Sequence, residues 1–195
     1  MAKVADKLCK EVQNCVFAYT QSDEISLVLV DYYNLNTDIW FGNNIQKICS
    51  VIAAKASVYF NNFLRDEISK NENNTRYQEL LLKISNKYAF FDARCFNIPR
   101  EEVLNYFIWR QKDCQKNSVS AIAQFYFSDK ELYKKSTKER IDMINKYAEE
   151  NNLAKYEEFD KTFLRGVTTF SKGSIACIDF IEERNKLNEM LGVKD

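Results

Sequence analysis

Two adjacent acids, Asp23 and Glu24, interrupt an apolar and β-prone stretch that reads FAYTQSDEISLVLV. Two such runs separated by four polar residues predict a β-hairpin, with strands at 15–20 and 25–30 and with Ser22 beside the acids at its turn. Carboxylate oxygens are the ligands that Mg²⁺ prefers, and the ion keeps its other positions for water and phosphate oxygens. The pattern therefore indicates a metal site. Solvated turn residues are the alternative, because Asp and Ser are common in turns.

A second group of polar side chains lies on a long helical pattern that starts at Arg100. Arg110, Asp113 and Asn117 stand at positions i, i+3 and i+7, so they share one helical face, and Gln111 lies about 100° away. Arginine can grip two phosphate oxygens at once, and asparagine suits sugar hydroxyls. This face is suited to line a nucleotide cleft. The alternative is a solvent-exposed face with an intrahelical pair between Arg110 and Asp113.

Two basic features accompany these groups. Lys172 precedes one of only four glycines, in the stretch SKGS, and places a cation near a turn. Residues 130–140 carry five Lys and Arg side chains near three acids. Both features are consistent with an ordinary solvated surface, and the second is also consistent with contacts to RNA phosphates.

The composition excludes several classes of protein. Lys plus Arg and Asp plus Glu number 28 each, which excludes nucleic-acid binding through bulk positive charge, and four glycines allow no Gly-rich phosphate loop. The chain has no histidine, and its six cysteines lack Cys-x-x-Cys spacing, so we expect reduced thiols and no zinc site. With no signal peptide and no apolar run of about 20 residues, we expect a cytoplasmic protein with no membrane partner.

Apolar periodicity and capping signals predict the elements that position these side chains. We expect helices at 2–13 and 44–63, a loop at 71–74, a short helix at 78–84, a strand in YAFFDARCFNIP at 88–99, the long helix from Arg100, and two helix starts at the capping boxes Ser128–Glu131 and Ser136–Glu139. With the hairpin, this order predicts an α+β fold of the ferredoxin-like βαββαβ type whose first strand is missing from this chain. We predict a core at 1–127 and a mainly helical C-terminal extension at 128–195.

Three stretches, AYTQSDEISLVLVD, FDARCFNIP and NYFIWRQKDCQKNS, resemble the tRNA-His guanylyltransferase family and its bacterial and phage relatives, the Thg1-like 3′–5′ RNA polymerases. The resemblance extends from about Leu8 to about Gly173. It implies a polymerase palm and a nucleotidyltransferase that adds nucleotides in the 3′–5′ direction to the 5′ end of tRNA. It also implies ATP activation of the 5′ phosphate, ATP and GTP or other NTPs as substrates, two Mg²⁺ ions, and a homotetramer built as a dimer of dimers.

The resemblance further implies roles for individual residues. Asp23 and Glu24 match the family's metal-binding and catalytic carboxylates. The helix residues match its RQ-x-D-x-x-x-N pattern, and Lys172 matches a basic residue before glycine near the end of the catalytic core. The residues with an implied nucleotide-binding role are Ser22, Arg110, Gln111, Asp113, Asn117 and Lys172.

Two departures from the family pattern limit these expectations. Family members carry an upstream strand with an Asp-Gly-Arg or Asp-Gly-Lys motif, and this sequence begins after it, so we expect a truncated core that lacks part of the metal site. The absence of histidine fits the bacterial and phage branch, which favours template-dependent repair of tRNA 5′ ends over addition of a single guanosine. Two alternatives stay open: a non-catalytic remnant that binds RNA or NTP or acts as an oligomerising partner, and a palm enzyme of the nucleotide-cyclase type.

Overall fold

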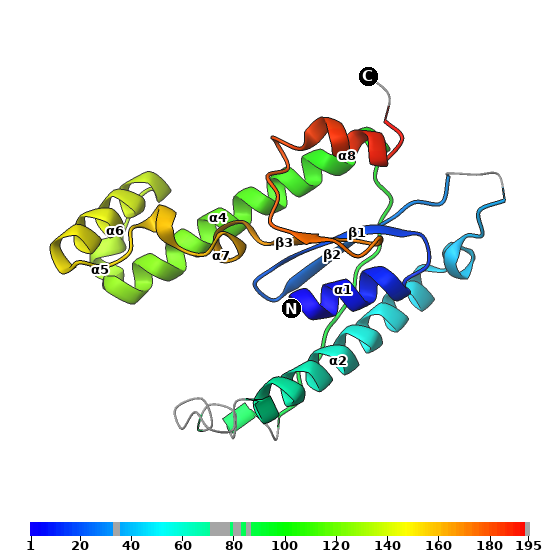
Figure 1. The fold of residues 1–195 in the computed structure, drawn as a ribbon, viewed down its shortest axis with the longest axis horizontal. Coiled ribbons are helices and arrows are strands. Elements are labelled where there is room, and N and C mark those ends of the chain that lie inside the picture. The colour runs from blue at the N-terminus through cyan, green and yellow to red at the C-terminus, as the bar shows by residue number, and fades with distance from the viewer. Residues whose placement is uncertain (33–35, 71–78, 80–82, 85–86, 194–195) are drawn as a thin grey trace. The chain divides into compact units, whose positions relative to one another are not determined.

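A computed structural model describes residues 1–32, 36–70, 79, 83–84 and 87–193 (Figure 1). The elements with assigned bounds are α1 (Ala2–Glu11), β1 (Cys15–Gln21), β2 (Glu24–Leu29), η1 (Trp40–Asn43), α2 (Ile45–Lys70), η2 (Arg100–Glu102), α4 (Val103–Tyr126), α5 (Asp129–Leu132), α6 (Thr137–Asn151), η3 (Tyr156–Glu158), α7 (Lys161–Arg165), β3 (Val167–Phe170), β4 (Ile175–Ala176) and α8 (Arg184–Met190). The strands form an antiparallel sheet in the order β2-β1-β3-β4. The predicted α+β class is confirmed. No helix within these ranges is long and apolar enough to cross a membrane.

The predicted hairpin is confirmed by β1 and β2. All seven residues of β1 are buried, as expected of an inner strand that has neighbours on both sides in the sheet. Ser22 and Asp23 form the turn, and Glu24 is the first residue of β2 rather than part of the turn. Ser22 has a φ of 47°, a left-handed conformation that is uncommon outside glycine and is found at tight turns.

The chain folds into two compact units, each assembled from several segments. The first unit comprises 1–18, 25–98 and 169–175, and the second comprises 19–24, 99–168 and 176–195. The predicted division into a core at 1–127 and an extension at 128–195 differs from these two units and stays a prediction. The predicted extension also contains β3 and β4, which the sequence reading did not identify.

In the first unit, α1 and α2 pack around an apolar cluster (Figure 1). The buried members of this cluster are Val4, Ala5, Leu8, Cys9, Val12, Cys15, Ala18 and Ala56. At its edge, the carboxylate of Glu11 on α1 pairs with Lys55 at 2.8 Å and accepts a hydrogen bond from Tyr59, both on α2. The predicted helices at 2–13 and 44–63 are thus confirmed, and α2 continues to Lys70.

The strand predicted at 88–99 is wrong. The segment has no strand structure, and side chains of α2 provide partners for its backbone. The amide of Ala89 donates to Asn61 Oδ1 at 3.0 Å, Asn61 Nδ2 donates to the Ala89 carbonyl at 2.8 Å, and the amide of Phe91 donates to Ser57 Oγ at 3.0 Å. A stretch rich in aromatic residues also suits an extended chain that lies on a helix. The loop predicted at 71–74 and most of the short helix predicted at 78–84 lie outside the described residues.

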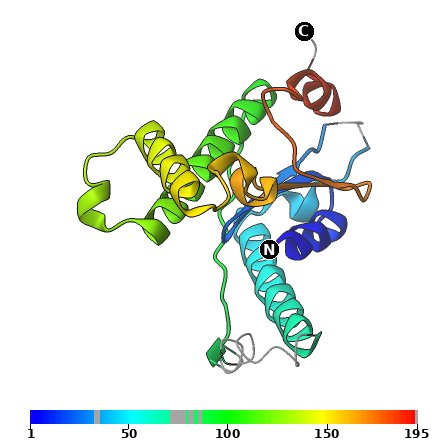
Figure 2. The same ribbon diagram turned by 60° about the vertical axis from the view of Figure 1, so that its left-hand side comes forward.

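In the second unit, α4 is a continuous helix with α6 alongside it, as both views show (Figures 1 and 2). The core between α4 and its neighbours contains the buried residues Val119, Ile122, Ala123, Leu132, Ile144 and Leu164. Both predicted capping boxes are confirmed. The carboxylate of Glu131 accepts from the Ser128 amide at 2.8 Å, and Glu139 does the same for Ser136, which starts α5 and α6.

All six cysteines have free thiols. Cys9 at the C-terminal end of α1 and Cys15 at the start of β1 are buried with their sulfur atoms 3.5 Å apart. The hydrogen bond that Cys15 donates lowers the pKa of Cys9, and the same bond together with burial raises the pKa of Cys15.

Candidate functional site

The β1–β2 turn presents its two acids differently. Ser22 and Asp23 are exposed, and the Asp23 carboxylate has no hydrogen-bond or ion-pair partner within the described ranges. Thr20 Oγ1 donates to the Glu24 carbonyl at 2.7 Å and closes the backbone of the turn. Gln21 Nε2 donates to the Glu24 carboxylate at 3.2 Å. The turn therefore holds Glu24 in place and leaves Asp23 facing solvent.

Arg110 joins the hairpin to α4. Its guanidinium forms an ion pair with the Glu24 carboxylate and lies 3.7 Å from the Asp113 carboxylate one turn further along the helix. The Arg110 side chain is only 11% exposed, whereas that of Glu24 is 57% exposed. The structure thus brings together three of the predicted site residues, although 85 positions separate Glu24 and Arg110 in the intervening sequence. The intrahelical Arg110–Asp113 contact considered in the sequence reading is also present.

Asn117 extends this face of α4. Its Nδ2 donates to Asp113 Oδ2 at 3.5 Å, at the long end of hydrogen bonding, and its side chain is exposed. Arg110, Asp113 and Asn117 therefore share one helical face, as their spacing predicts. Their nucleotide contacts stay predictions, as do those of Ser22.

Gln21 is a site residue that the sequence reading missed. It is buried, and its Oε1 atom has no hydrogen-bond partner among the described residues, although its Nε2 binds Glu24. A buried acceptor without a partner is costly. The available signal was a long polar side chain at the last position of a buried strand, directly before the turn.

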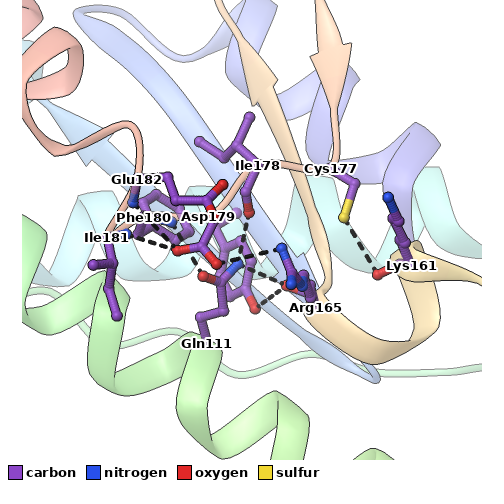
Figure 3. Close-up of polar contacts among 10 residues, drawn as sticks. Gln111, Lys161, Arg165, Cys177, Ile178, Asp179, Phe180, Ile181 and Glu182 are labelled. Carbon is purple, nitrogen blue, oxygen red and sulfur yellow. Dashed lines mark hydrogen bonds and ion pairs between the residues drawn. The ribbon is translucent and has the colours of Figure 1, made fainter. Parts of the chain in front are cut away.

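Gln111 faces the protein interior (Figure 3). Its Nε2 donates to the carbonyls of Arg165 at 3.2 Å and Ile178 at 2.8 Å, and its Oε1 accepts from the Phe180 amide at 3.1 Å. The Arg165 guanidinium pairs with Asp179 at 3.3 Å beside these contacts. The amide of Gln111 thus attaches α4 to two other segments of the second unit. These backbone contacts give Gln111 a structural role, and its predicted contact with a nucleotide stays a prediction.

An aromatic cluster supports α4 against β1. The ring centroids of Tyr19 and Phe107 are 6.1 Å apart, and both rings lie 5.3 Å from that of Phe180. The Tyr19 hydroxyl donates to the Arg165 carbonyl at 2.8 Å, and burial raises the pKa of this phenol. Gly166 follows directly, so close to β1 that a Cβ atom would lie 2.6 Å from the Tyr19 hydroxyl. These contacts fix the part of α4 that carries Arg110.

Lys172 lies in the turn between β3 and β4, in the first unit, and is exposed. The Gly173 amide donates to the Phe170 carbonyl at 2.9 Å, and the Phe170 amide donates to the Ser174 carbonyl at 2.9 Å. This turn is therefore tight, as the SKGS stretch indicates. The acids of the β1–β2 turn belong to the other unit, and the role predicted for Lys172 stays a prediction.

The donor set at the hairpin suits one magnesium ion. Asp23 and Glu24 are adjacent carboxylates, but Glu24 is already paired with Arg110, and the described residues contain no group of three or more Cys, Asp or Glu side chains placed to hold a metal. Mg²⁺ commonly takes one or two protein carboxylates and completes its octahedron with water and substrate phosphates. A second ion needs more carboxylates than this set supplies. The two-ion site stays a prediction.

Comparisons with known proteins agree with the resemblance noted in the sequence. A family model described as tRNAHis guanylyltransferase (Thg1) matches residues 1–99. The solved structure of a bacterial tRNA(His) guanylyltransferase (Thg1)-like protein in complex with ATP is 30% identical with a TM-score of 0.79, and the match covers 97% of this chain and 78% of that one.

Two curated relatives are longer than this chain. The uncharacterized protein R259 of Acanthamoeba polyphaga mimivirus is 31% identical over 65% of this chain, and the probable tRNA(His) guanylyltransferase of Dictyostelium discoideum is 27% identical over 95%. The matches cover 46% and 66% of these relatives, so this chain spans about half to two thirds of their length. On the family match and the structural likeness, the chain belongs to the tRNAHis guanylyltransferase family.

Proposed function

We propose that this chain acts as a nucleotidyltransferase that adds nucleotides in the 3′–5′ direction to the 5′ end of tRNA. The observation that carries the proposal is the meeting of Glu24 and Arg110, which places an acid of the β1–β2 turn against the guanidinium of the α4 motif. Family membership supports the reaction class, and the ATP complex of the bacterial relative supports a nucleoside triphosphate as substrate. Activation of the tRNA 5′ phosphate by ATP belongs to the same proposal.

In this proposal, Arg110 holds the triphosphate. Its planar fork matches two phosphate oxygens, and α4 fixes its position through the contacts of Gln111 and the aromatic cluster. Asp113 orients the guanidinium from the helical side, and Asn117 offers an amide to a sugar hydroxyl at the exposed end of the face. Ligand binding then requires Arg110 to exchange Glu24 for phosphate.

Asp23 and Glu24 are the residues that would hold Mg²⁺. When bound there, the ion would neutralise phosphate charge and lower the pKa of a coordinated hydroxyl. Asp23 is free to bind it directly, because its carboxylate has no partner in the described part of the chain. Glu24 becomes free once Arg110 turns to phosphate, so the two events favour each other. A second ion, a homotetramer and a cytoplasmic location remain predictions.

The test is extension of a 5′-truncated tRNA with a 5′ monophosphate, incubated with the full chain, ATP, GTP and Mg²⁺. We expect product, and we expect Asp23→Asn to reduce its rate by about 100-fold or more, because one preorganised electrostatic contact is typically worth that much. Asp142→Asn is the matched control, since Asp142 is an exposed acid on α6. Arg110→Lys keeps the charge but loses the fork, so it weakens triphosphate binding.

The outcomes separate the proposal from the non-catalytic alternative. Extension that Asp23→Asn leaves unchanged contradicts the assigned site. Binding of NTP or tRNA without any extension favours the remnant, for which the small donor set among the described residues is the supporting observation. Formation of cyclic dinucleotides from GTP alone would instead favour the nucleotide-cyclase alternative.

A further inference from the structure

An exposed indole lies beside Arg110. Trp109 on α4 is 58% exposed, and the guanidinium carbon of Arg110 lies 5.0 Å from the centroid of its ring. The ring of Tyr106, one turn earlier, lies 5.9 Å away at an interplanar angle of 51°. Because the same guanidinium also binds Glu24, one cation connects the β1–β2 turn to this indole.

The arrangement leaves one indole face available. The guanidinium lies over one side of the ring, yet Trp109 as a residue stays exposed to solvent. Covering an exposed aromatic ring with another flat apolar group removes apolar surface from water, which is favourable. The guanidinium attracts one face of the ring, so the opposite face is left for a flat partner.

We propose that Trp109 is a stacking platform for the nucleobase of a ligand whose phosphates bind Arg110. The inference rests on the proposed function and adds a contact for the base, which none of the residues discussed above supplies. A base offers the flat π face that an indole accepts, and the attached phosphates match the neighbouring cation. The base belongs either to a nucleoside triphosphate or to the terminal nucleotide of an RNA.

Stacking has a consequence for selectivity. Every base has a π face, so a stacking platform tolerates different bases and discriminates weakly between them. Trp109 therefore contributes affinity for ATP and for GTP alike. Selection between the two has to come from hydrogen bonds made elsewhere, or from a template strand.

The test uses the emission of Trp109 itself. The chain has two tryptophans, so Trp40→Phe leaves Trp109 as the sole indole in an otherwise full-length protein. Titration with GTP or ATP in Mg²⁺ is expected to quench this emission more strongly than inorganic tripolyphosphate does, because tripolyphosphate reaches Arg110 but has no base to stack on the indole. Quenching by a 5′-monophosphorylated RNA alone would assign the platform to the RNA end, and quenching by NTP would assign it to the free nucleotide.

Calorimetry on substituted chains provides the second measurement. Replacing a base-stacking aromatic by alanine weakens binding by roughly 5- to 150-fold, so Trp109→Ala is expected to weaken NTP or RNA binding by that factor. Its affinity for tripolyphosphate stays within about twofold, and Trp109→Phe recovers most of the loss because it restores a π face. Phe125→Ala is the matched control, because Phe125 is 83% exposed on the same helix and is expected to have no effect.

Each outcome decides between the two proposals. If NTP or RNA binds by calorimetry but neither quenches Trp109, and Trp109→Ala binds as tightly as the parent, the stacking inference is overturned while the proposed function stands. If none of these ligands binds, both are overturned. Emission that responds to protein concentration but not to nucleotide would assign the indole to a protein interface and would also overturn the inference.

Discussion

Gly166 is the position where one methyl group is expected to be most costly. The residue follows α7 with a φ of 76° and a ψ of −174°, a region of backbone space that is essentially restricted to glycine. A Cβ atom there would lie 2.6 Å from the Tyr19 hydroxyl oxygen and 2.7 Å from the Thr20 carbonyl oxygen. The carbonyl belongs to the backbone of β1, so it can yield only if the strand moves.

The expected loss for Gly166→Ala follows from three contributions. Backbone strain costs about 1–3 kcal/mol. Insertion of a carbon into a filled space costs about 1–3 kcal/mol, and loss of the hydrogen bond from Tyr19 to the Arg165 carbonyl costs about 1 kcal/mol. Together these give a decrease of roughly 3–7 kcal/mol in the free energy of unfolding.

Gly42→Ala is the matched control. Gly42 has a φ of 59°, but nothing lies within 4 Å of its Cβ position, so only left-handed strain of about 1–2 kcal/mol applies. Urea denaturation followed by circular dichroism at about 222 nm measures both variants against the parent, and thermal midpoints fall by about 2–4 °C per kcal/mol in a chain of this size. The reasoning is refuted if Gly166→Ala is no more destabilising than Gly42→Ala, because the close approach to β1 then has no energetic effect.

Three further predictions concern other parts of the molecule. Lys55 and Tyr59 hold the pKa of Glu11 below its usual value of 4.5. The stabilisation by ionised Glu11 is therefore present above pH 4.5 and is lost as the pH falls through the lower pKa of the folded state. Glu11→Gln should cost at most about 1 kcal/mol at pH 7 and progressively less in acid, as measured by urea denaturation across pH. Gln111→Leu removes the hydrogen bonds to the Ile178 carbonyl and from the Phe180 amide, whereas the Arg165 carbonyl keeps its bond from Tyr19. We therefore expect a loss of about 2–6 kcal/mol and faster hydrogen exchange of the Phe180 amide, whereas unchanged exchange would contradict the role of Gln111. Ser136→Ala removes a helix cap and should cost about 1 kcal/mol, with a measurable loss of protection in the first turn of α6.

Local signals in the sequence were sufficient for the hairpin and the capped helices. Two β-prone runs with four polar residues between them permit few arrangements other than a hairpin. The capping-box residues Ser128 and Ser136 form hydrogen bonds within the first turns of the helices that they start. Each of these features depends on side chains within a few positions of one another. That is the range over which residue type and spacing decide structure.

Features that depend on distant partners could not be predicted. β3 and β4 have four and two residues, too few to show a periodic pattern, and they are strands because β3 pairs with β1 and β4 pairs with β3. The segment at 88–99 has the composition of a strand, but its backbone finds partners on Ser57 and Asn61 of α2 instead.

The candidate site divides in the same way. Helical spacing placed Arg110, Asp113 and Asn117 on one face, because the angle between residues is fixed in a helix. Helical spacing does not show how deeply a side chain is buried, so it did not reveal that Gln111 is enclosed by the backbone of two other segments. The pairing of Arg110 with Glu24 also depends on the tertiary fold, and only the family resemblance suggested that the two belong together.

Glu24 and Asp113 contact Arg110, so an anion that binds this arginine has to displace a carboxylate. The guanidinium has lost most of its water before any ligand arrives, and Glu24 and Asp113 already offset its charge. A phosphate that binds there replaces one anion with another, so the process is an exchange and not the capture of a free cation. The affinity for the anion then falls less steeply with ionic strength than it does at exposed lysines, where binding releases counterions. Preference among anions depends instead on how well two of their oxygens fit the arginine fork.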